Sequence, residues 1–456
     1  MRKTISILLI CICAMTQLIV ADEAHEEKTY PYIKPIFSER FRLVTWDNAI
    51  SLDDRANAER FFTRHRTSLG GQLCLNKNFD FTIKLTNEFR YYVEPDEKIN
   101  SGFHEVFVDH LNLRYRFGSK LPLILTIGRQ NIILGEGFVV MDGHPLDGSR
   151  SIYFNAIRLD VKFSKSTSGT FFYSTQTERD EALPLIRDRK QSLVEQPEQG
   201  GGVYLKTKLQ KTDIHLYYIY KKLEPTKYHN WLYGFSSDIN TIGARTNYSI
   251  SEKLSVTGEG AYQFGSYRNH SDRKDRSAFA GYLYFNYSSS KDSHPFTISP
   301  GMYYYSGDKP QTDKIEGWEP LFSRWPKWSE SYIYTQINES TVAYWSNIYS
   351  FFVKSKIQLL PKVDLLFDFH RMYAPRFPIV ITGLIGNDIT PPDNTMRGNL
   401  YIFKLNFRLN KHWSGHLLWE EFAPGQFHHK MKSLASVSDV IADGYSWVRA
   451  EILFKL

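Results

Sequence analysis

Arginine and lysine recur near the middle of segments in which apolar and polar residues alternate. In the segment LTIGRQNIILGEG (Leu125–Gly137), for example, Arg129 follows Leu125 and Ile127 at a spacing of two. A planar guanidinium binds carboxylates and phosphates through paired hydrogen bonds, and rings of such cations on a pore wall favour anions. The residues predicted to line a pore and bind its solute in this way are Arg64, Arg66, Arg114, Arg129, Arg158, Lys206, Arg245, Lys404 and Arg449.

Acidic residues occupy similar positions, so a second interpretation of the basic residues stays open. The carboxylates are Glu88, Asp160, Glu259, Asp368, Glu420 and Glu451. If most of them pair with the basic side chains, the pairs hold the wall rigid and bind no solute. The formal net charge of the chain is +7, a modest excess of basic residues, which the anion-binding interpretation requires to be concentrated inward.

The sequence carries none of the common motifs for catalysis or metal binding. Its 14 histidines are scattered, and there is no HExxH, CxxC or GxSxG motif. The loop Met141–Arg150 holds Asp142 and Asp147 but lacks the spacing of an EF-hand, so turn chemistry explains it. We therefore predict no enzyme, no catalytic residue, no metal ligand and no cofactor. A barrel hydrolase is the remaining enzymatic alternative. It would be supported if the protein hydrolysed lipid and lost this activity when one Ser or His was changed.

The first residues have the composition of a secretory signal peptide. Arg2 and Lys3 precede an apolar run from Ile5 to about Val20, and the small residue Ala21 follows. Cleavage near Ala21 leaves Cys74 as the one cysteine, so no intramolecular disulfide is available. A single-pass membrane anchor is the alternative interpretation of the same run.

The elements that position the basic residues are predicted to be long β-strands. In FDFTIKLTNEFRYYV (Phe79–Val93) and NLYIFKLNFRLN (Asn399–Asn410), apolar and polar residues alternate over ten or more positions, as in a tilted membrane-crossing strand. Aromatic residues make up 15% of the chain and its mean hydropathy is −0.39. This combination is expected when each strand shows one face to lipid and the other to water.

Short polar turns alternate with long connections along the chain. The turns include NKN, GSK, STSG, QKT, SEK, PK and NKH, and the long connections are Ile132–Arg150, Glu178–Gly200, Ser306–Ser340, Ala374–Arg397 and Ala423–Ala442. This rhythm is typical of an outer-membrane barrel with short periplasmic turns and long extracellular loops, and the segments number about eighteen.

The two ends of the predicted barrel are complementary. The amphipathic segment YSWVRAEILFKL reaches the C-terminus and would pair with ERFRLVTWD (Glu39–Asp47), which leaves no free edge. The sequence thus predicts an all-β transmembrane antiparallel barrel over residues 39–456, in the outer membrane of a Gram-negative type of cell. A signal peptide (residues 1–21) and a periplasmic N-terminal segment (residues 22–38) precede it.

Strict alternation would point Arg129 at lipid, where a guanidinium at mid-depth costs about 2–4 kcal/mol. We therefore expect a β-bulge at Gly128 that turns Arg129 into the lumen. The alternative places Arg129 in the interfacial zone, where it reaches the headgroups. Arg129 and Arg158 lie on neighbouring strands, so we expect them to form a basic constriction together with Arg64, Arg245 and Arg449.

The region from Gly128 to Phe163 resembles the signature region of the alginate-export family of outer-membrane barrels. The matching residues are Gly128, Arg129, Gln130, Gly135, Glu136, Gly137, Arg150, Phe154, Ile157 and Arg158, and the departures are Phe138, Asn155 and Ala156. The resemblance implies a monomeric barrel of about eighteen strands that exports an anionic, alginate-like polysaccharide through a positively charged pore. The departure at Asn155 removes a charge that would hold a lumenal arginine.

Two solute classes are therefore predicted for a channel with a basic lumen. The first is an anionic polysaccharide, exported with the help of periplasmic secretion components, and the alternative is small anions that diffuse through a porin. The other expected partners are outer-membrane lipid and lipopolysaccharide, with no nucleic acid. The barrel is expected to be a monomer, because its own closure stabilises it.

Overall fold

The computed structural model describes most of the chain after the signal segment. The described residues are 29–56, 59–95, 105–141, 153–187, 192–226, 228, 234–269, 272–289, 294–309, 312–324, 327–339, 342–376, 395–435 and 442–456. The predicted signal peptide and the predicted cleavage near Ala21 lie outside this set, and so does most of the predicted loop Ala374–Arg397.

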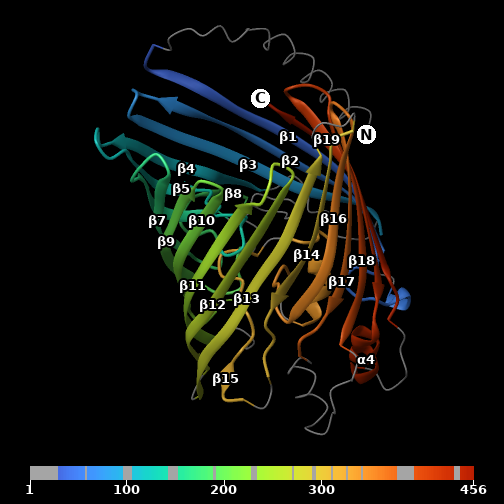
Figure 1. The fold of residues 1–456 in the computed structure, drawn as a ribbon. Coiled ribbons are helices and arrows are strands. Elements are labelled where there is room, and N and C mark those ends of the chain that lie inside the picture. The colour runs from blue at the N-terminus through green and yellow to red at the C-terminus, as the bar shows by residue number, and fades with distance from the viewer. Residues whose placement is uncertain are drawn as a thin grey trace.

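Within the described residues, the chain forms one closed antiparallel ring of eighteen long strands, which confirms the predicted all-β barrel (Figure 1). The last strand pairs with the first, from Ser38 opposite Lys455 to Asp47 opposite Ser446. The long strands are β1 (Tyr32–Asp47), β2 (Arg60–Cys74), β3 (Phe79–Glu94), β4 (Val106–Phe117), β5 (Leu123–Gln130), β6 (Phe154–Lys162), β7 (Thr167–Gln176), β9 (Glu198–Leu209), β10 (Thr212–Leu223), β11 (Phe235–Ser249), β12 (Leu254–Asn269), β13 (Asp272–Ser289), β14 (Phe296–Tyr305), β16 (Ile348–Leu360), β17 (Val363–Tyr373), β18 (Met396–Arg408), β19 (Trp413–Pro424) and β20 (Tyr445–Lys455).

Short elements occur in the connections between these strands. Two-residue strands, β8 (Leu185–Ile186) and β15 (Lys314–Ile315), pair with β4 and β13. The described helices are η1 (Asp54–Ala56), α2 (Tyr332–Thr335), η3 (Gln336–Asn338) and α4 (Gln426–Ala435). Helix α4 lies inside the connection that the sequence assigns to a loop, Ala423–Ala442, at the end of the barrel away from the C-terminus (Figure 1).

The period-two pattern of the strands separates an apolar outer face from a mixed inner face. On β12, Glu259 and Gln263 are buried while Tyr262 and Phe264 are exposed. The same alternation on other strands leaves a belt of exposed Leu, Ile, Phe and Tyr around the barrel. Such a belt is the surface of a barrel that spans a membrane. No helix in the described part of the chain is long and apolar enough to cross a membrane.

The two rims differ in the length of their connections, with one exception. The short turns and the C-terminus share one rim, because Tyr32 pairs with Cys74 and Leu456 donates a backbone hydrogen bond to Phe37. The longer connections lie at the other rim, but there β12 ends at Asn269 and β13 begins at Asp272, so the alternation of short and long is broken. The first strand also begins at Tyr32 and not at Glu39, so it includes residues assigned above to a periplasmic segment.

We predict that the rim with the short turns faces the periplasm. In a Cys74→Ser background, a single cysteine at Thr312 should react with a membrane-impermeant maleimide on intact cells, whereas one at Lys77 or Glu252 should react only after lysis. Reaction of the turn positions on intact cells would reverse the proposed orientation.

The closing seam of the barrel is marked by aromatic rings from both ends of the chain. Trp46 of β1 and Trp447 of β20 lie 4.6 Å apart between ring centroids. Tyr334 of α2, which belongs to the connection between β15 and β16, stacks on Trp447 at 5.3 Å. The seam is therefore in contact with a segment from the middle of the chain.

Candidate functional site: the lumen and its ion-paired carboxylates

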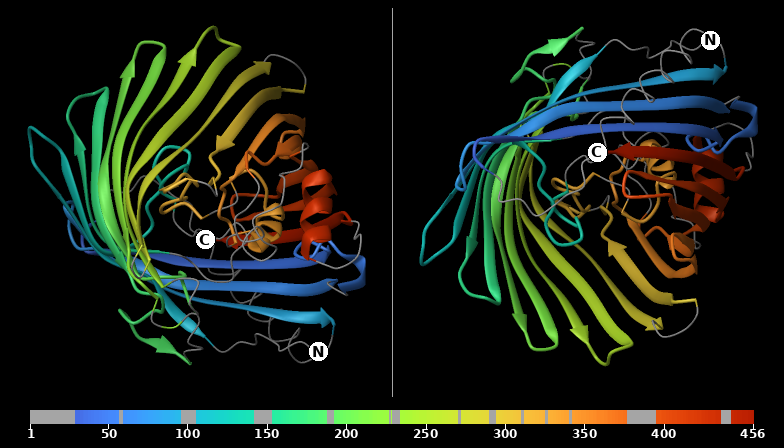
Figure 2. Two further views of the ribbon diagram at one scale, coloured as in Figure 1. Left: turned by 90° about the horizontal axis from the view of Figure 1, so that it is seen from below. Right: turned by 90° about the horizontal axis from the view of Figure 1, so that it is seen from above.

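Two connections fold into the ring of strands and narrow its lumen. They are the connection after β5 (residues 131–141 and 153 of it are described) and the connection between β14 and β16. Both lie within the ring when the barrel is viewed from its ends (Figure 2). The two segments pair with each other, since Met141 donates a backbone hydrogen bond to Phe322 and Phe322 donates one to Val139. The lumen is thus partly filled by protein and is not an open tube.

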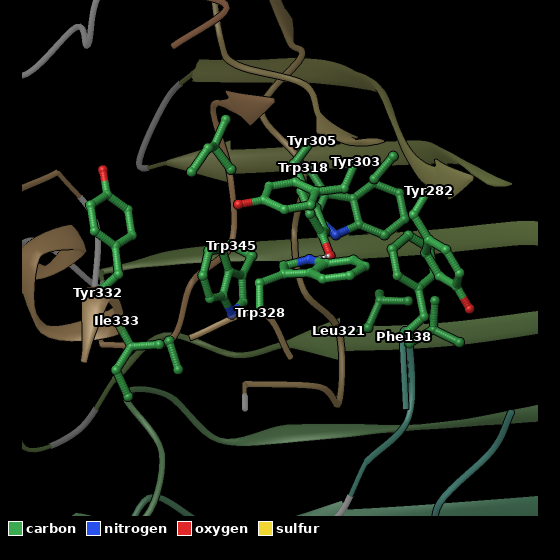
Figure 3. Packing of buried hydrophobic residues seen from close by; sticks show 14 of the residues in the cluster. Phe138, Tyr282, Tyr303, Tyr305, Trp318, Leu321, Trp328, Tyr332, Ile333 and Trp345 are labelled. Carbon is green, nitrogen blue, oxygen red and sulfur yellow. Dashed lines mark hydrogen bonds between the residues drawn. The ribbon is translucent and has the colours of Figure 1, made fainter. Parts of the chain in front are cut away.

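Aromatic side chains from both connections and from the wall form a cluster that fills this part of the lumen (Figure 3). Phe138 stacks on Trp318 with ring centroids 5.7 Å apart, and Trp328 stacks on Tyr303 of β14 at 4.5 Å. The indole nitrogen of Trp328 donates to the Tyr305 hydroxyl at 2.9 Å. We refer to the two inward connections together as the plug.

Glu136 fastens the first inward connection to the wall and to the second inward connection. Its carboxylate lies 2.5 Å from the Arg245 guanidinium and 3.3 Å from the Lys327 ammonium, and it accepts a hydrogen bond from Tyr284 at 2.7 Å. Burial alone would raise the pKa of Glu136, but Lys327 and Arg245 lower it to about 2. Glu136 is therefore ionised at neutral pH, and two cations share its one charge.

Glu330 fastens the second inward connection in the same way. It forms an ion pair with Arg449 of β20, and its carboxylate lies 3.4 Å from the Lys404 ammonium on β18. Burial would raise the pKa of Glu330, but Arg449 and Lys404 lower it to about 2. Two cations again share one carboxylate.

A third shared carboxylate lies on the wall formed by the first strands. Glu88 of β3 pairs with Arg40 of β1 at 3.4 Å, and with Arg64 and Arg66 of β2 at 3.1 and 2.7 Å. Arg66 also reaches Asp109 at 3.4 Å. Three guanidiniums thus surround one fully enclosed carboxylate.

In a fourth network, close to the rim with the long connections, carboxylates outnumber the cations. There Lys221 and Arg324 pair with the three carboxylates Glu195, Glu198 and Glu319. The local excess of positive charge therefore belongs to the deeper part of the barrel.

Arg129 lies in neither of the two environments expected for it. It is 1% exposed, pairs with Asp180 at 2.7 Å and lies over the Tyr153 ring at 3.6 Å. Its Nη1 also donates to the Val108 carbonyl at 2.7 Å. Asp180 comes from the connection after β7, which encloses Arg129 in protein. The Arg129 side chain therefore lies neither in the open lumen nor in the headgroup zone.

The β-bulge expected at Gly128 is not found either, because the pairing of β5 contains no extra residue there. Gly128 has φ +115°, a conformation that favours glycine, but β5 keeps a continuous register with β4 and β6. The register shift lies one strand away, between Lys84 and Leu85 of β3 where it pairs with β4.

Arg158 pairs with Asp160 of its own strand at 2.9 Å and does not approach Arg129. The register sets Arg158 opposite Thr126 and Arg129 opposite Asn155, so the proposed convergence of the two arginines is wrong. Arg158 instead shares a pocket of about 450 Å³ with Lys206 at the rim of the short turns.

The other predicted site residues belong to separate groups. Arg64 and Arg66 join Glu88, Arg245 joins Glu136, and Arg449 and Lys404 join Glu330, while Arg114 is exposed near Asp80. The residues expected to form a single constriction are Arg64, Arg129, Arg158, Arg245 and Arg449. The structure therefore does not bring these residues together in one constriction, and each belongs to a different ion-pair group on the barrel wall.

Two inward arginines of the first strand, Arg40 and Arg42, are not among the residues predicted from the sequence. Arg42 pairs with Glu451 at 2.5 Å, and both arginines are buried. Their spacing of two within ERFRL was the available signal, because it sets both on the face opposite Phe41 and Leu43.

No group of three or more His, Cys, Asp or Glu side chains in the described residues is arranged to hold a metal ion.

Comparison with known proteins identifies the fold through solved structures alone. No protein-family model and no curated protein sequence matches the chain. The BenF-like porin of Pseudomonas fluorescens Pf-5 aligns with a TM-score of 0.55 at 8% identity, over 93% of this chain and 98% of the porin. Pseudomonas aeruginosa OccK2 (OpdF), solved in complex with glucuronate, aligns with a TM-score of 0.53 at 10% identity, over 93% of this chain and 98% of OccK2. Acinetobacter baumannii OccAB1 aligns with a TM-score of 0.54 at 9% identity, over 96% of this chain and all of OccAB1 (100%).

These findings correct the resemblance drawn from the sequence. The structural neighbours are porins of the Occ and BenF-like type, not alginate-export barrels, so the alginate-export assignment is wrong. Polysaccharide export and periplasmic secretion partners lose their support with it. The short Gly-Arg-Gln and Gly-Glu-Gly matches misled because the backbone alone accounts for their glycines: Gly128, Gly135 and Gly137 all have positive φ, which favours glycine. The porin fold and the apolar belt confirm the predicted outer-membrane location.

Proposed function

We propose that this protein is a diffusion channel for small anionic solutes, carboxylates of about the size of a sugar acid. One observation carries the proposal: Glu88, Glu136 and Glu330 are each shared by two or three cations. Within ion-pair distance, cations outnumber carboxylates around each of the three, Asp109 and Lys84 beside Glu88 included, and we expect this excess to attract anions into the lumen and to repel cations.

The plug supports small solutes over polymers. The aromatic cluster and its ion pairs fix both inward connections across the lumen, and this narrowing favours small solutes over a polymer chain. The glucuronate bound in the OccK2 structure offers a test solute of the proposed size and charge. The protein acts as a passive channel in this proposal and performs no chemistry.

The proposal is tested by conductance of the purified protein in planar bilayers. In a salt gradient the reversal potential should show preference for chloride over potassium. Millimolar glucuronate should reduce the chloride current, while the neutral sugar glucose at the same concentration should leave it unchanged. A cation-selective pore, or equal effects of glucuronate and glucose, would overturn the proposal.

We predict that the channel is a monomer, because eighteen strands pair in a complete ring and leave no free edge in the described wall. Light scattering after size exclusion in mild detergent should give the protein mass of one chain. A trimer that persists on dilution would contradict this expectation.

A further inference from the structure

The rim with the short turns carries a ring of lysines. Each of the seven short turns that the structure describes throughout contains one lysine, and each of these lysines is exposed. The lysines are Lys77, Lys120, Lys165, Lys211, Lys253, Lys362 and Lys411.

Few negative charges accompany this lysine ring. Within the seven turns the one carboxylate is Glu252. At the strand ends beside this rim, four further lysines are exposed (Lys34, Lys162, Lys208 and Lys455), alongside the carboxylates of Asp213 and Asp364. The other rim differs, because its described connections mix both signs, as in the Asp53–Arg55 ion pair near η1.

An exposed apolar side chain lies within three residues of every lysine of the ring. Leu360 beside Lys362 is 61% exposed, Leu409 beside Lys411 is 57% exposed and Phe163 beside Lys165 is 47% exposed. The corresponding residues at the other four turns are Leu75, Leu121, Leu209 and Ile250. These side chains continue the apolar belt to the edge of the turns.

This pairing of lysine with an apolar neighbour matches the boundary of a lipid leaflet. The apolar side chain contacts acyl chains, while the flexible lysine stem carries its ammonium outward to the phosphate groups. A water-soluble acidic partner would fit the ammonium groups but would leave seven apolar side chains in water. The geometry therefore favours lipid as the partner of this rim.

We propose that the lysine ring binds the phosphate groups of anionic phospholipids in the leaflet next to the short turns. The ring then draws a shell of phospholipids of the phosphatidylglycerol class around this rim. The surface is separate from the lumen, and its role does not depend on which solute passes.

The test counts lipids bound to the mature protein by native mass spectrometry in non-ionic detergent. The protein is titrated with phosphatidylglycerol and with phosphatidylcholine of the same acyl composition. Wild type should bind phosphatidylglycerol at least threefold more tightly, and the preference should weaken as ionic strength rises. A ring variant with Lys77, Lys120, Lys211 and Lys362 changed to Gln should lose most of this preference.

A matched variant removes the same number of charges from the opposite rim. It changes Lys222, Lys274, Lys309 and Lys314 to Gln and should keep the wild-type preference. Heat-modified migration on gels checks that both variants form barrels. Equal binding of the two lipids by wild type, an unchanged preference in the ring variant, or an equal loss in both variants would overturn the proposal.

Discussion

A channel that carries Arg40→Gln and Arg66→Gln together is expected to lose most of its preference for anions. The pair is chosen so that no carboxylate is left alone: Glu88 keeps Arg64 at 3.1 Å, and Asp109 keeps Lys84 at 2.7 Å. The change removes two positive charges from the first wall, and glutamine preserves hydrogen bonding. The fold should therefore survive while the field in the lumen falls.

The size of the effect follows from Coulomb's law. A unit charge about 8 Å from a passing ion contributes roughly 0.5 kcal/mol even at the dielectric constant of water. Two such charges favour an anion by about 1 kcal/mol and disfavour a cation by about as much, so without screening they change the ratio of anion to cation permeability by roughly thirtyfold. Screening at about 0.1 M salt lowers this to about fivefold, and the effect is larger in a narrower, less polar space. The measurement is the reversal potential at about 0.1 M salt, and the difference should shrink at about 1 M, where the Debye length is about 3 Å.

The control is a variant with the same net charge but with both changes outside the lumen. Arg55→Gln together with Lys314→Gln serves, because Arg55 is 69% exposed and Lys314 of β15 is exposed where it pairs with Asp275, near the start of β13 at the rim away from the short turns. This control should retain the wild-type reversal potential. If the lumen variant also retains it, the arginines around Glu88 only brace the wall, which is the second interpretation raised by the sequence.

Replacing Asp180 with alanine is expected to destabilise the barrel by about 3–5 kcal/mol, the range for breaking a buried ion pair from one side. Asp180 accepts two hydrogen bonds from Arg129, at 2.9 and 2.7 Å, and another from the Tyr153 hydroxyl. Without it, the Arg129 guanidinium stays enclosed and has no ion-pair partner among the described residues. The measurement is the midpoint of urea unfolding in lipid vesicles, followed by tryptophan fluorescence.

The neighbouring strand offers a matched comparison. Asp160 pairs with Arg158 at a similar distance, 2.9 Å, but the two side chains are 30% and 26% exposed. Water therefore screens this pair, and Asp160→Ala should cost no more than about 1 kcal/mol. Equal losses from the two alanine variants would mean that the enclosure of Arg129 contributes nothing to stability.

The strands were predictable because every side chain in a barrel wall has one of two surroundings. Alternation such as that of Phe403 and Lys404 therefore reports directly on orientation, and it located most strands and their number. The first strand was placed too late in the chain because its early residues, from Tyr32 to Ser38, alternate less clearly. The predicted alternation of short and long connections fails between Asn269 and Asp272, because β12 and β13 extend until only two residues separate them.

The lumen was harder to predict because its contacts join distant parts of the chain. Arg129 meets Asp180 across 51 positions, and Lys327 meets Glu136 across 191. A sequence shows that a basic residue faces inward but not which connection returns to cover it. The groups around Glu88, Glu136 and Glu330 thus depend on tertiary packing that no local pattern records.

The contact between the closing seam and the plug has a consequence for the order of assembly. Trp447 belongs to β20, the strand that closes the ring against β1, and it touches both Trp46 of β1 and Tyr334 of the plug. The plug can therefore complete its packing only when the two ends of the chain have met. We therefore expect the wall to close and the plug to reach its final packing together, so that a barrel without the β1–β20 pairing has neither a closed wall nor a finished passage.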